Sequence, residues 1–103
     1  MPSLRFSLRA EADLLSIGEY AVETWGETQA ARYIDNLEAC CLLIADNPDV
    51  GRMCDYIRPG LRRIESEKHV VFYRVEPGQG VTITRLLHQQ MLPEMQAFED
   101  ESG

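Results

Sequence analysis

The stretch HVVFYRV, residues 69–75, decides the fold of this chain. Its residues 70–73 are apolar on both faces, which is typical of a central strand. The runs at 61–66 and 81–87 also have strand character, and in the second of them valine and isoleucine alternate with threonine, which indicates one core face and one outer face. Because the breaks between the three runs are short, the pattern predicts an antiparallel three-stranded meander.

Two amphipathic helices are expected before these strands. Apolar residues recur at intervals of three and four over residues 14–25, with Ser7 as the expected cap and Gly26 as the expected stop. A second helix follows, with Thr28 as its expected cap and the Asn-Pro pair at 47–48 as its end. The loop between the two helices is so short that they must form an antiparallel helical hairpin.

A short strand at residues 5–8 completes the expected order, which is β-α-α-β-β-β. The hairpin and the sheet each have one apolar face, so they must cover each other. We therefore predict a two-layer α+β domain in which the helical hairpin packs on an antiparallel sheet. It is one domain over residues 1–103, with a core at about 4–91 and a C-terminal tail at 92–103, where Met95 and Phe98 suggest one last helical turn.

Composition narrows the classes of protein to consider. The chain has 103 residues, of which 45% are hydrophobic and 26% charged, as in an ordinary globular domain. The longest apolar stretch, 39–45, is far shorter than the roughly 20 residues of a membrane span, and no signal-peptide pattern opens the sequence. Its three cysteines and two histidines lack the spacing of a disulfide framework or a metal site. We expect a cytoplasmic protein with no membrane partner, no metal and no cofactor.

The net charge of −7 is unevenly distributed along the chain. Residues 1–50 hold three basic and nine acidic residues, residues 51–91 hold seven basic and four acidic ones, and the last twelve residues hold four acidic ones. An acidic protein is repelled by phosphate backbones, so general nucleic-acid binding is not expected. The arginines of the sheet half either form internal ion pairs and a solvated face or meet an acidic partner, and the sequence leaves both open.

Aromatic and apolar residues widen the buried stripe of the hairpin. Leu15, Tyr20, Trp25 and Tyr33 lie at its edges, which indicates either ordinary packing or a groove for a helix or strand of a partner. The two histidines stand at strand ends and are either structural or a general acid or base, since histidine titrates near neutral pH.

Three runs in their order resemble a known family. RPGLRR at 58–63, HVVFYR at 69–74 and I-x-RLLH at 83–88 are similar to the ParE toxins of bacterial type II toxin–antitoxin modules, in the RelE/ParE superfamily, and the resemblance spans about residues 4–91. It implies the same β-α-α-β-β-β order. It also implies a ParD-like antitoxin whose C-terminal part folds along the hairpin to form a hetero-oligomer, and a non-catalytic action on DNA gyrase.

Two surfaces follow from the stripe, the charge pattern and the resemblance. The expected antitoxin-binding residues are Leu15, Tyr20, Trp25, Tyr33 and Leu37. The expected target-binding residues are Arg62, Arg74, Arg85 and His88.

The superfamily also contains ribosome-dependent mRNA endonucleases, which is the alternative function. That chemistry requires a cation for the scissile phosphate, a base and an acid, for which His88, Arg85 and Arg62 are the candidates. The resemblance disfavours it, because Val70 stands where the nucleases have a basic residue and glutamines follow position 88 where they have a tyrosine. We therefore expect no enzyme activity; a third reading is a decayed module without toxicity.

Overall fold

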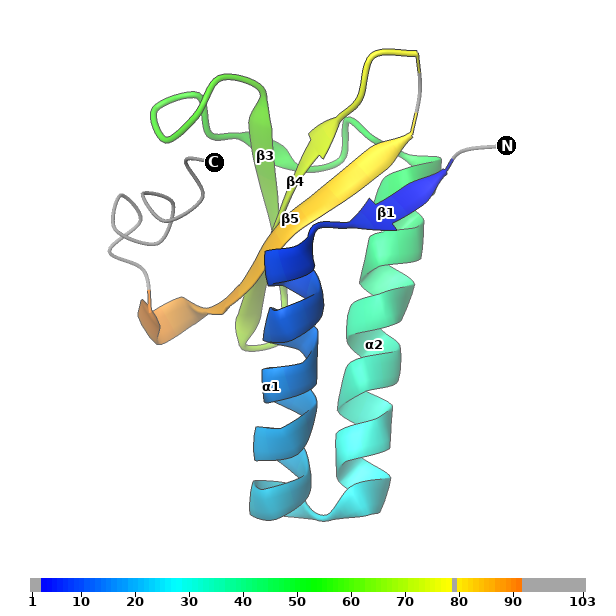
Figure 1. The fold of residues 1–103 in the computed structure, drawn as a ribbon, viewed down its shortest axis with the longest axis vertical. Helices are drawn as coiled ribbons and strands as arrows, with labels where there is room; N and C mark the ends of the chain where they lie inside the picture. The colour runs from blue at the N-terminus through cyan, green and yellow to red at the C-terminus, as the bar shows by residue number, and fades with distance from the viewer. Residues whose placement is uncertain (1–2, 79, 92–103) are drawn as a thin grey trace.

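The computed structural model describes residues 3–78 and 80–91 and confirms the predicted α+β class (Figure 1). Its elements are β1 (Leu4–Phe6), α1 (Leu8–Trp25), α2 (Glu27–Asp46), β2 (Arg52–Met53), β3 (Leu61–Ser66), β4 (His69–Val75), β5 (Val81–His88) and a 3₁₀ turn, η1 (Gln89–Met91). The helical hairpin packs against the sheet in a second layer. The expectation for the tail at 92–103 lies outside the described residues.

The sheet has the strand order β1-β5-β4-β3-β2. The antiparallel meander of β3, β4 and β5 is confirmed, with β4 in the centre. The sheet as a whole is mixed rather than antiparallel, because β1 runs parallel to β5, with Leu4 opposite Val81 and Phe6 opposite Ile83. A strand of three residues carries no signal about the direction of its pairing, so the sequence pattern could not give this feature.

β2 is a second difference, since the sequence predicted only a connector between α2 and β3. Its two residues pair antiparallel with β3, Arg52 opposite Arg63 and Met53 opposite Arg62. Both are exposed and the strand is too short to show an alternating pattern, which is why it was missed.

The ends of the helices follow local chemistry. Ser7 caps α1 as predicted, and its hydroxyl accepts a hydrogen bond from the backbone N–H of Ala10 at 3.0 Å. Gly26 ends α1 as predicted, with a φ of +88°. The prediction of Thr28 as the cap of α2 is wrong: α2 begins at Glu27, because the positive φ of Gly26 reverses the chain within one residue.

The central strand has a buried face on each side, as its composition predicted. On the helix side, Val71 and Tyr73 join the core between the hairpin and the sheet. On the other side, Val70 and Phe72 belong to a smaller buried cluster with residues of β3, β5 and the connector.

Cys40, Cys41 and Cys54 form no disulfide, and Cys41 and Cys54 are buried. Burial raises the pKa of Cys41 to about 12, so this thiol packs as a small hydrophobic side chain and stays unreactive. Within residues 3–78 and 80–91, no helix combines the length and the apolar character that a membrane crossing requires.

Candidate functional site: an acid-rimmed groove on the helical hairpin

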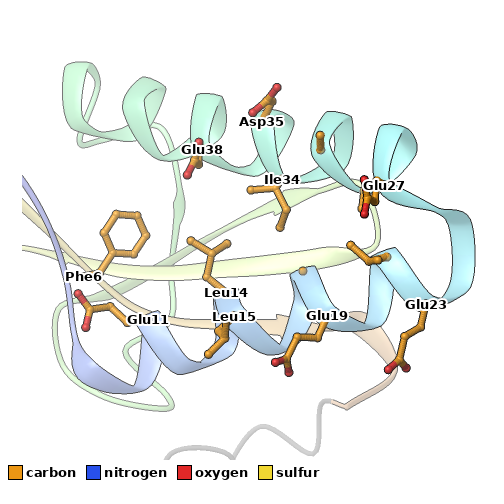
Figure 2. A pocket seen from close by; sticks show the side chains of 14 residues that line it. Phe6, Glu11, Leu14, Leu15, Glu19, Glu23, Glu27, Ile34, Asp35 and Glu38 are labelled. Atoms are coloured by element: carbon orange, nitrogen blue, oxygen red, sulfur yellow. The ribbon is translucent and has the colours of Figure 1, made fainter.

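A groove of about 1060 Å³ lies between α1 and α2 (Figure 2). Leu14 and Ile34 point toward each other across it, and Phe6 of β1 closes one end. The apolar lining includes side chains that water reaches, since Leu15 is 65% exposed and Val22 is 44% exposed. The apolar lining residues are Phe6, Leu14, Leu15, Val22, Ala30, Ala31 and Ile34, with Gly18 between them.

Carboxylates surround this apolar floor and project outward from both helices (Figure 2). They are Glu11, Glu19 and Glu23 from α1 and Glu27, Asp35 and Glu38 from α2. None of the fourteen lining residues is basic. An apolar groove with such a rim is chemically suited to an amphipathic segment that carries positive charge beside its apolar residues.

A second pocket, of about 420 Å³, lies on another side of α1, where the hairpin meets the ends of β4 and β5. It is lined by Ser16, Ile17, Tyr20, Trp25, Tyr33, Lys68, His69, His88 and Gln90. The aromatic and imidazole side chains among these residues contact one another in a row. The distance between ring centroids is 6.2 Å for Tyr20 and Trp25, 5.4 Å for Trp25 and Tyr33, 5.5 Å for Tyr33 and His69, and 5.2 Å for His69 and His88.

His69 lines this second pocket and is uncharged at neutral pH. Its Nδ1 and the hydroxyl of Tyr33 are 2.5 Å apart, and the same hydroxyl accepts a hydrogen bond from the backbone N–H of Lys68 at 3.2 Å. Burial first, and the neighbouring His88 second, lower the pKa of His69 to about 4, against an opposing effect of Asp13. The cross-strand register places His69 and His88 directly opposite each other.

The five residues expected to bind the antitoxin do not share one surface. Leu15 lines the groove, whereas Tyr20, Trp25 and Tyr33 line the aromatic pocket. Leu37 is 0% exposed and belongs to the core between hairpin and sheet, so its assignment to a binding surface is wrong. It occupies the middle of the buried stripe of α2, and the periodicity of a helix does not separate the middle of a wide stripe from its edge.

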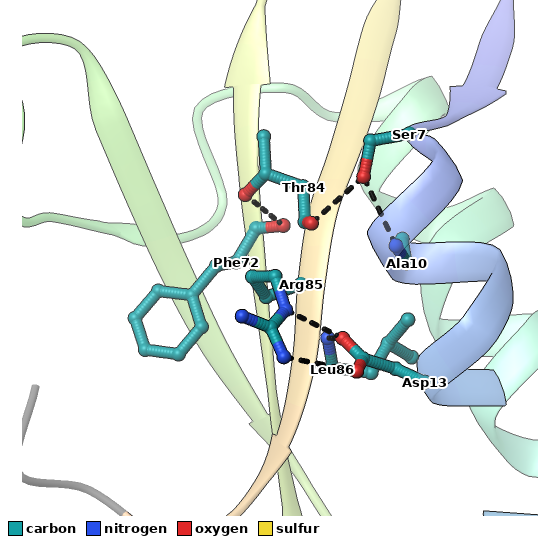
Figure 3. Close-up of polar contacts among 7 residues, drawn as sticks. All are labelled: Ser7, Ala10, Asp13, Phe72, Thr84, Arg85 and Leu86. Atoms are coloured by element: carbon teal, nitrogen blue, oxygen red, sulfur yellow. Dashed lines mark hydrogen bonds and ion pairs between the residues drawn. The ribbon is translucent and has the colours of Figure 1, made fainter. Parts of the chain in front are cut away.

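Arg85 is engaged inside the molecule (Figure 3). Its guanidinium donates hydrogen bonds to the two carboxylate oxygens of Asp13 at 2.8 and 3.0 Å, and the two side chains are only 13% and 15% exposed. The same carboxylate accepts the backbone N–H of Leu86 at 3.0 Å. The ion pair therefore fastens α1 to β5, and this is the internal role that the sequence left open for these arginines.

The remaining target-binding candidates are dispersed. Arg62 donates to the carbonyl of Gly51 at 2.8 Å and lies 3.6 Å from the carboxylate of Asp49. Arg74 pairs with the carboxylate of Glu76 at 3.1 Å and stays half exposed. It lies near the start of β5, whereas His88 is at the far end of that strand, so the four residues do not converge on one site.

The sequence reasoning missed the acidic rim. The signal was present, because Glu11, Glu19 and Glu23 recur at intervals of eight and four on α1, beside Leu15 and Val22. Periodicity on one helix, however, does not show that a second helix brings further carboxylates to the same groove.

Comparison with solved structures first defines the class of fold. A chain described as "Chromosomal ParDE TA system from P. aeruginosa" superposes with a TM-score of 0.73 at 23% identity, over 85% of this chain and 96% of that chain. The two-layer arrangement of a helical hairpin on a five-stranded sheet is therefore shared with a ParDE protein.

Sequence comparison then gives the family. The family model described as "ParE toxin of type II toxin-antitoxin system, parDE" matches residues 4–93. Toxin ParE1 of Caulobacter vibrioides is 46% identical over 91 residues, 88% of this chain and 93% of that protein. Toxin ParE of Escherichia coli is 31% identical over 88% of each chain. This chain belongs to the ParE toxin family of type II toxin–antitoxin systems, which confirms the resemblance drawn from its sequence.

Proposed function

We propose that a ParD-like antitoxin neutralises this ParE toxin by laying an amphipathic, positively charged segment in the groove between α1 and α2, and that the toxin inhibits DNA gyrase without catalysing a reaction. The observation that carries the first part is the groove itself: an open apolar floor with six carboxylates around it. The floor would bury the apolar face of the segment, and the rim would attract its cationic residues.

The size of the groove supports a helical or extended segment as its occupant. α1 has 18 residues, which corresponds to a length of roughly 27 Å at about 1.5 Å per residue. The residues of α1 that line the groove run from Glu11 to Glu23, so the groove extends along most of the helix. A segment that folds on binding can cover such a surface, while the ordering entropy it loses reduces its affinity.

The positions and charge states of the side chains that a nuclease would use support a function without catalysis. Arg85 is held by Asp13, and the low pKa of His69 leaves this imidazole without charge at neutral pH. A ribonuclease needs a cation and a proton donor near one phosphate. Arg62 and Arg74 lie away from His88 and are paired with Asp49 and Glu76, so these two arginines do not converge with His88 on one phosphate.

The groove is tested with charge substitutions at exposed apolar positions. In the double variant Leu15→Lys/Val22→Lys, antitoxin binding should weaken at least tenfold, since two ammonium groups would stand where the apolar face of the antitoxin segment is buried. Leu42→Lys/Leu43→Lys is the matched control, because Leu42 and Leu43 are 59% and 48% exposed on the same hairpin but do not line the groove. Equal affinities of both variants, measured by isothermal titration calorimetry, would contradict the proposed groove.

The target is tested separately with purified DNA gyrase. A supercoiling assay with micromolar toxin should show loss of supercoiled product, and added antitoxin should restore it. Unchanged supercoiling would reject gyrase as the target. Sequencing of transcript ends after induction, with a His88→Ala variant alongside, examines the alternative: specific cuts that disappear in this variant would establish the nuclease.

A further inference from the structure

The aromatic pocket, which the proposed function does not use, has an apolar wall and a polar wall. The helical hairpin supplies the apolar wall, made of Ile17, Tyr20, Trp25 and Tyr33. The ends of β4 and β5, with the turns beside them, supply the polar wall, made of Lys68, His69, His88 and Gln90. The volume of about 420 Å³ lies within the range of small-molecule sites, which is roughly 300–1,000 Å³. A ligand that fits both walls must therefore have an apolar part and a polar part.

The polar wall offers hydrogen-bond donors. The hydroxyl of Tyr33 accepts the backbone N–H of Lys68, and because Tyr33 is only 8% exposed its own proton needs an acceptor, which is Nδ1 of His69. Nδ1 of His88 accepts the backbone N–H of Gln90 at 3.1 Å. In a neutral imidazole whose Nδ1 is an acceptor, the proton is on Nε2, so each of these rings has an N–H to donate. The ammonium group of Lys68 adds three further donors.

The charges around the polar wall favour a ligand with one negative charge. Among the described residues that line the pocket, Lys68 is the one lysine or arginine, and none carries a carboxylate. The carboxylates of Asp13 and Glu67 act on His69 and Tyr33 from nearby, but Asp13 pairs with Arg85, and Glu67 accepts a hydrogen bond from an asparagine amide at 2.9 Å. One ammonium group beside neutral donors matches a carboxylate better than a phosphate, which carries almost two charges.

We propose that the aromatic pocket binds a small aromatic carboxylate, with the ring of the ligand against Tyr20 and Trp25 and its carboxylate beside Lys68. Tyr20 and Trp25 meet edge to face, at an interplanar angle of 82°, and are 62% and 37% exposed, so both keep ring surface that a ligand can cover. The pocket and the groove share no lining residue and lie on different sides of α1. The inference is therefore independent of the proposed antitoxin site and of gyrase.

The experiment titrates the full chain with phenylacetate, and with 2-phenylethanol as the matched uncharged compound, followed by ¹H–¹⁵N NMR. We expect saturable shifts of amide signals at residues 68–69 and 88–90 and none in the helical groove, with a Kd of about 1 mM or lower, the scale of a small fragment. Trp25 is the single tryptophan of the chain, so its fluorescence should change with the same Kd. The alcohol should bind at least tenfold more weakly, because it cannot pair with an ammonium group. Shifts in the groove, no saturable shift up to about 10 mM, or equal affinity for the alcohol would overturn the proposal.

Two pairs of variants at exposed positions test the two ends of the ligand separately. Lys68→Gln should weaken phenylacetate binding at least fivefold, whereas Arg32→Gln, which removes an exposed cation outside the pocket, should leave it unchanged. Tyr20→Ala should also weaken it at least fivefold, whereas Tyr56→Ala removes a ring of similar exposure, 64%, outside the pocket and should have no effect. Equal affinities within the first pair would overturn the contact with the carboxylate, and equal affinities within the second pair would overturn the contact with the ring.

Discussion

Asp13 satisfies two groups at once, and this double role makes it the most consequential single carboxylate on α1. It pairs with Arg85 and also accepts the backbone N–H of Leu86, on the edge of β5 beyond the point where β1 ends (Figure 3). Without it, a largely buried guanidinium and a backbone donor would both lose this carboxylate as an acceptor.

We predict that Asp13→Ala lowers the free energy of unfolding by about 3 kcal/mol, because it removes the two-oxygen acceptor of a largely buried guanidinium and the acceptor of a backbone N–H. Arg74→Ala is the control: its side chain is 54% exposed, and an exposed pair contributes less than about 1 kcal/mol. Urea titration followed by circular dichroism measures both. Equal losses in the two variants would contradict the structural role of Asp13.

His69 leads to a prediction about pH. Its pKa is lowered from 6.5 to about 4 by burial, so between these values the unfolded chain binds a proton that the folded chain does not. The stability due to this group is complete above pH 6.5 and is lost as the pH falls toward 4. The thermal midpoint should fall over this window, and His69→Gln should flatten that part of the profile. An NMR titration of the His69 ring with a midpoint near 6.5 would refute the shift.

Single residues also mark where the sequence was informative and where it was not. The cap by Ser7 and the stop at Gly26 were predictable, because both depend on chemistry within three or four residues of chain. The partner of Arg85 was not, since Asp13 is 72 positions away and only the tertiary fold brings the two together. Interactions within a few residues of chain can be predicted from sequence, whereas an ion pair between a helix and a strand can be predicted only once the packing of the two is known.

At the scale of elements, the connector between α2 and β3 is held by one tyrosine. The hydroxyl of Tyr73 donates to the carbonyl of Pro48 and accepts the backbone N–H of Gly51, each at 2.8 Å. This contact positions β2 against β3, although the sequence of the connector shows only turn-forming residues. The element was missed because its stability comes from a side chain of another strand.

Gly51→Ala should destabilise the fold by about 2 kcal/mol, since a Cβ at this position would lie 2.7 Å from the backbone oxygen of Arg63 and 2.7 Å from the hydroxyl of Tyr73. Gly60→Ala is the comparison, because a Cβ there meets no atom within 4 Å and only the φ of +81° is unfavourable, at about 1 kcal/mol. Thermal unfolding of both variants measures the two losses of stability. A smaller loss at position 51 than at position 60 would contradict the close contact.

The elements of the hairpin and the meander were predictable because each is long enough to show its period. The parallel pairing of β1 and the existence of β2 were not, since two or three residues give no period. The candidate site was likewise predictable only in the part that depends on a single helix. Leu15 was found from one helix, but the groove is made by two helices, and its acidic rim becomes visible only when α1 and α2 lie side by side.

At the scale of the whole molecule, six of the seventeen carboxylates of the chain lie where the proposed partner would bind. Six carboxylates line the groove, whereas the arginines of the sheet half pair largely with other carboxylates of the chain. This distribution separates a negative helical layer from a more positive sheet layer. It favours rapid encounter of the hairpin with a basic segment and discourages encounter with nucleic acid.

The association rate of the antitoxin should therefore depend on salt. Between about 50 and 500 mM salt we expect the association rate constant to fall roughly tenfold while the dissociation rate changes little, since screening acts mainly on the encounter of exposed charges. Glu19→Gln/Glu23→Gln should weaken this dependence, because both side chains line the groove. Asp46→Asn/Asp49→Asn changes the net charge equally, but outside the groove, and should retain it. Surface plasmon resonance measures the rate constants, and identical salt dependence in the two double variants would show that the net charge, rather than the rim, governs the encounter.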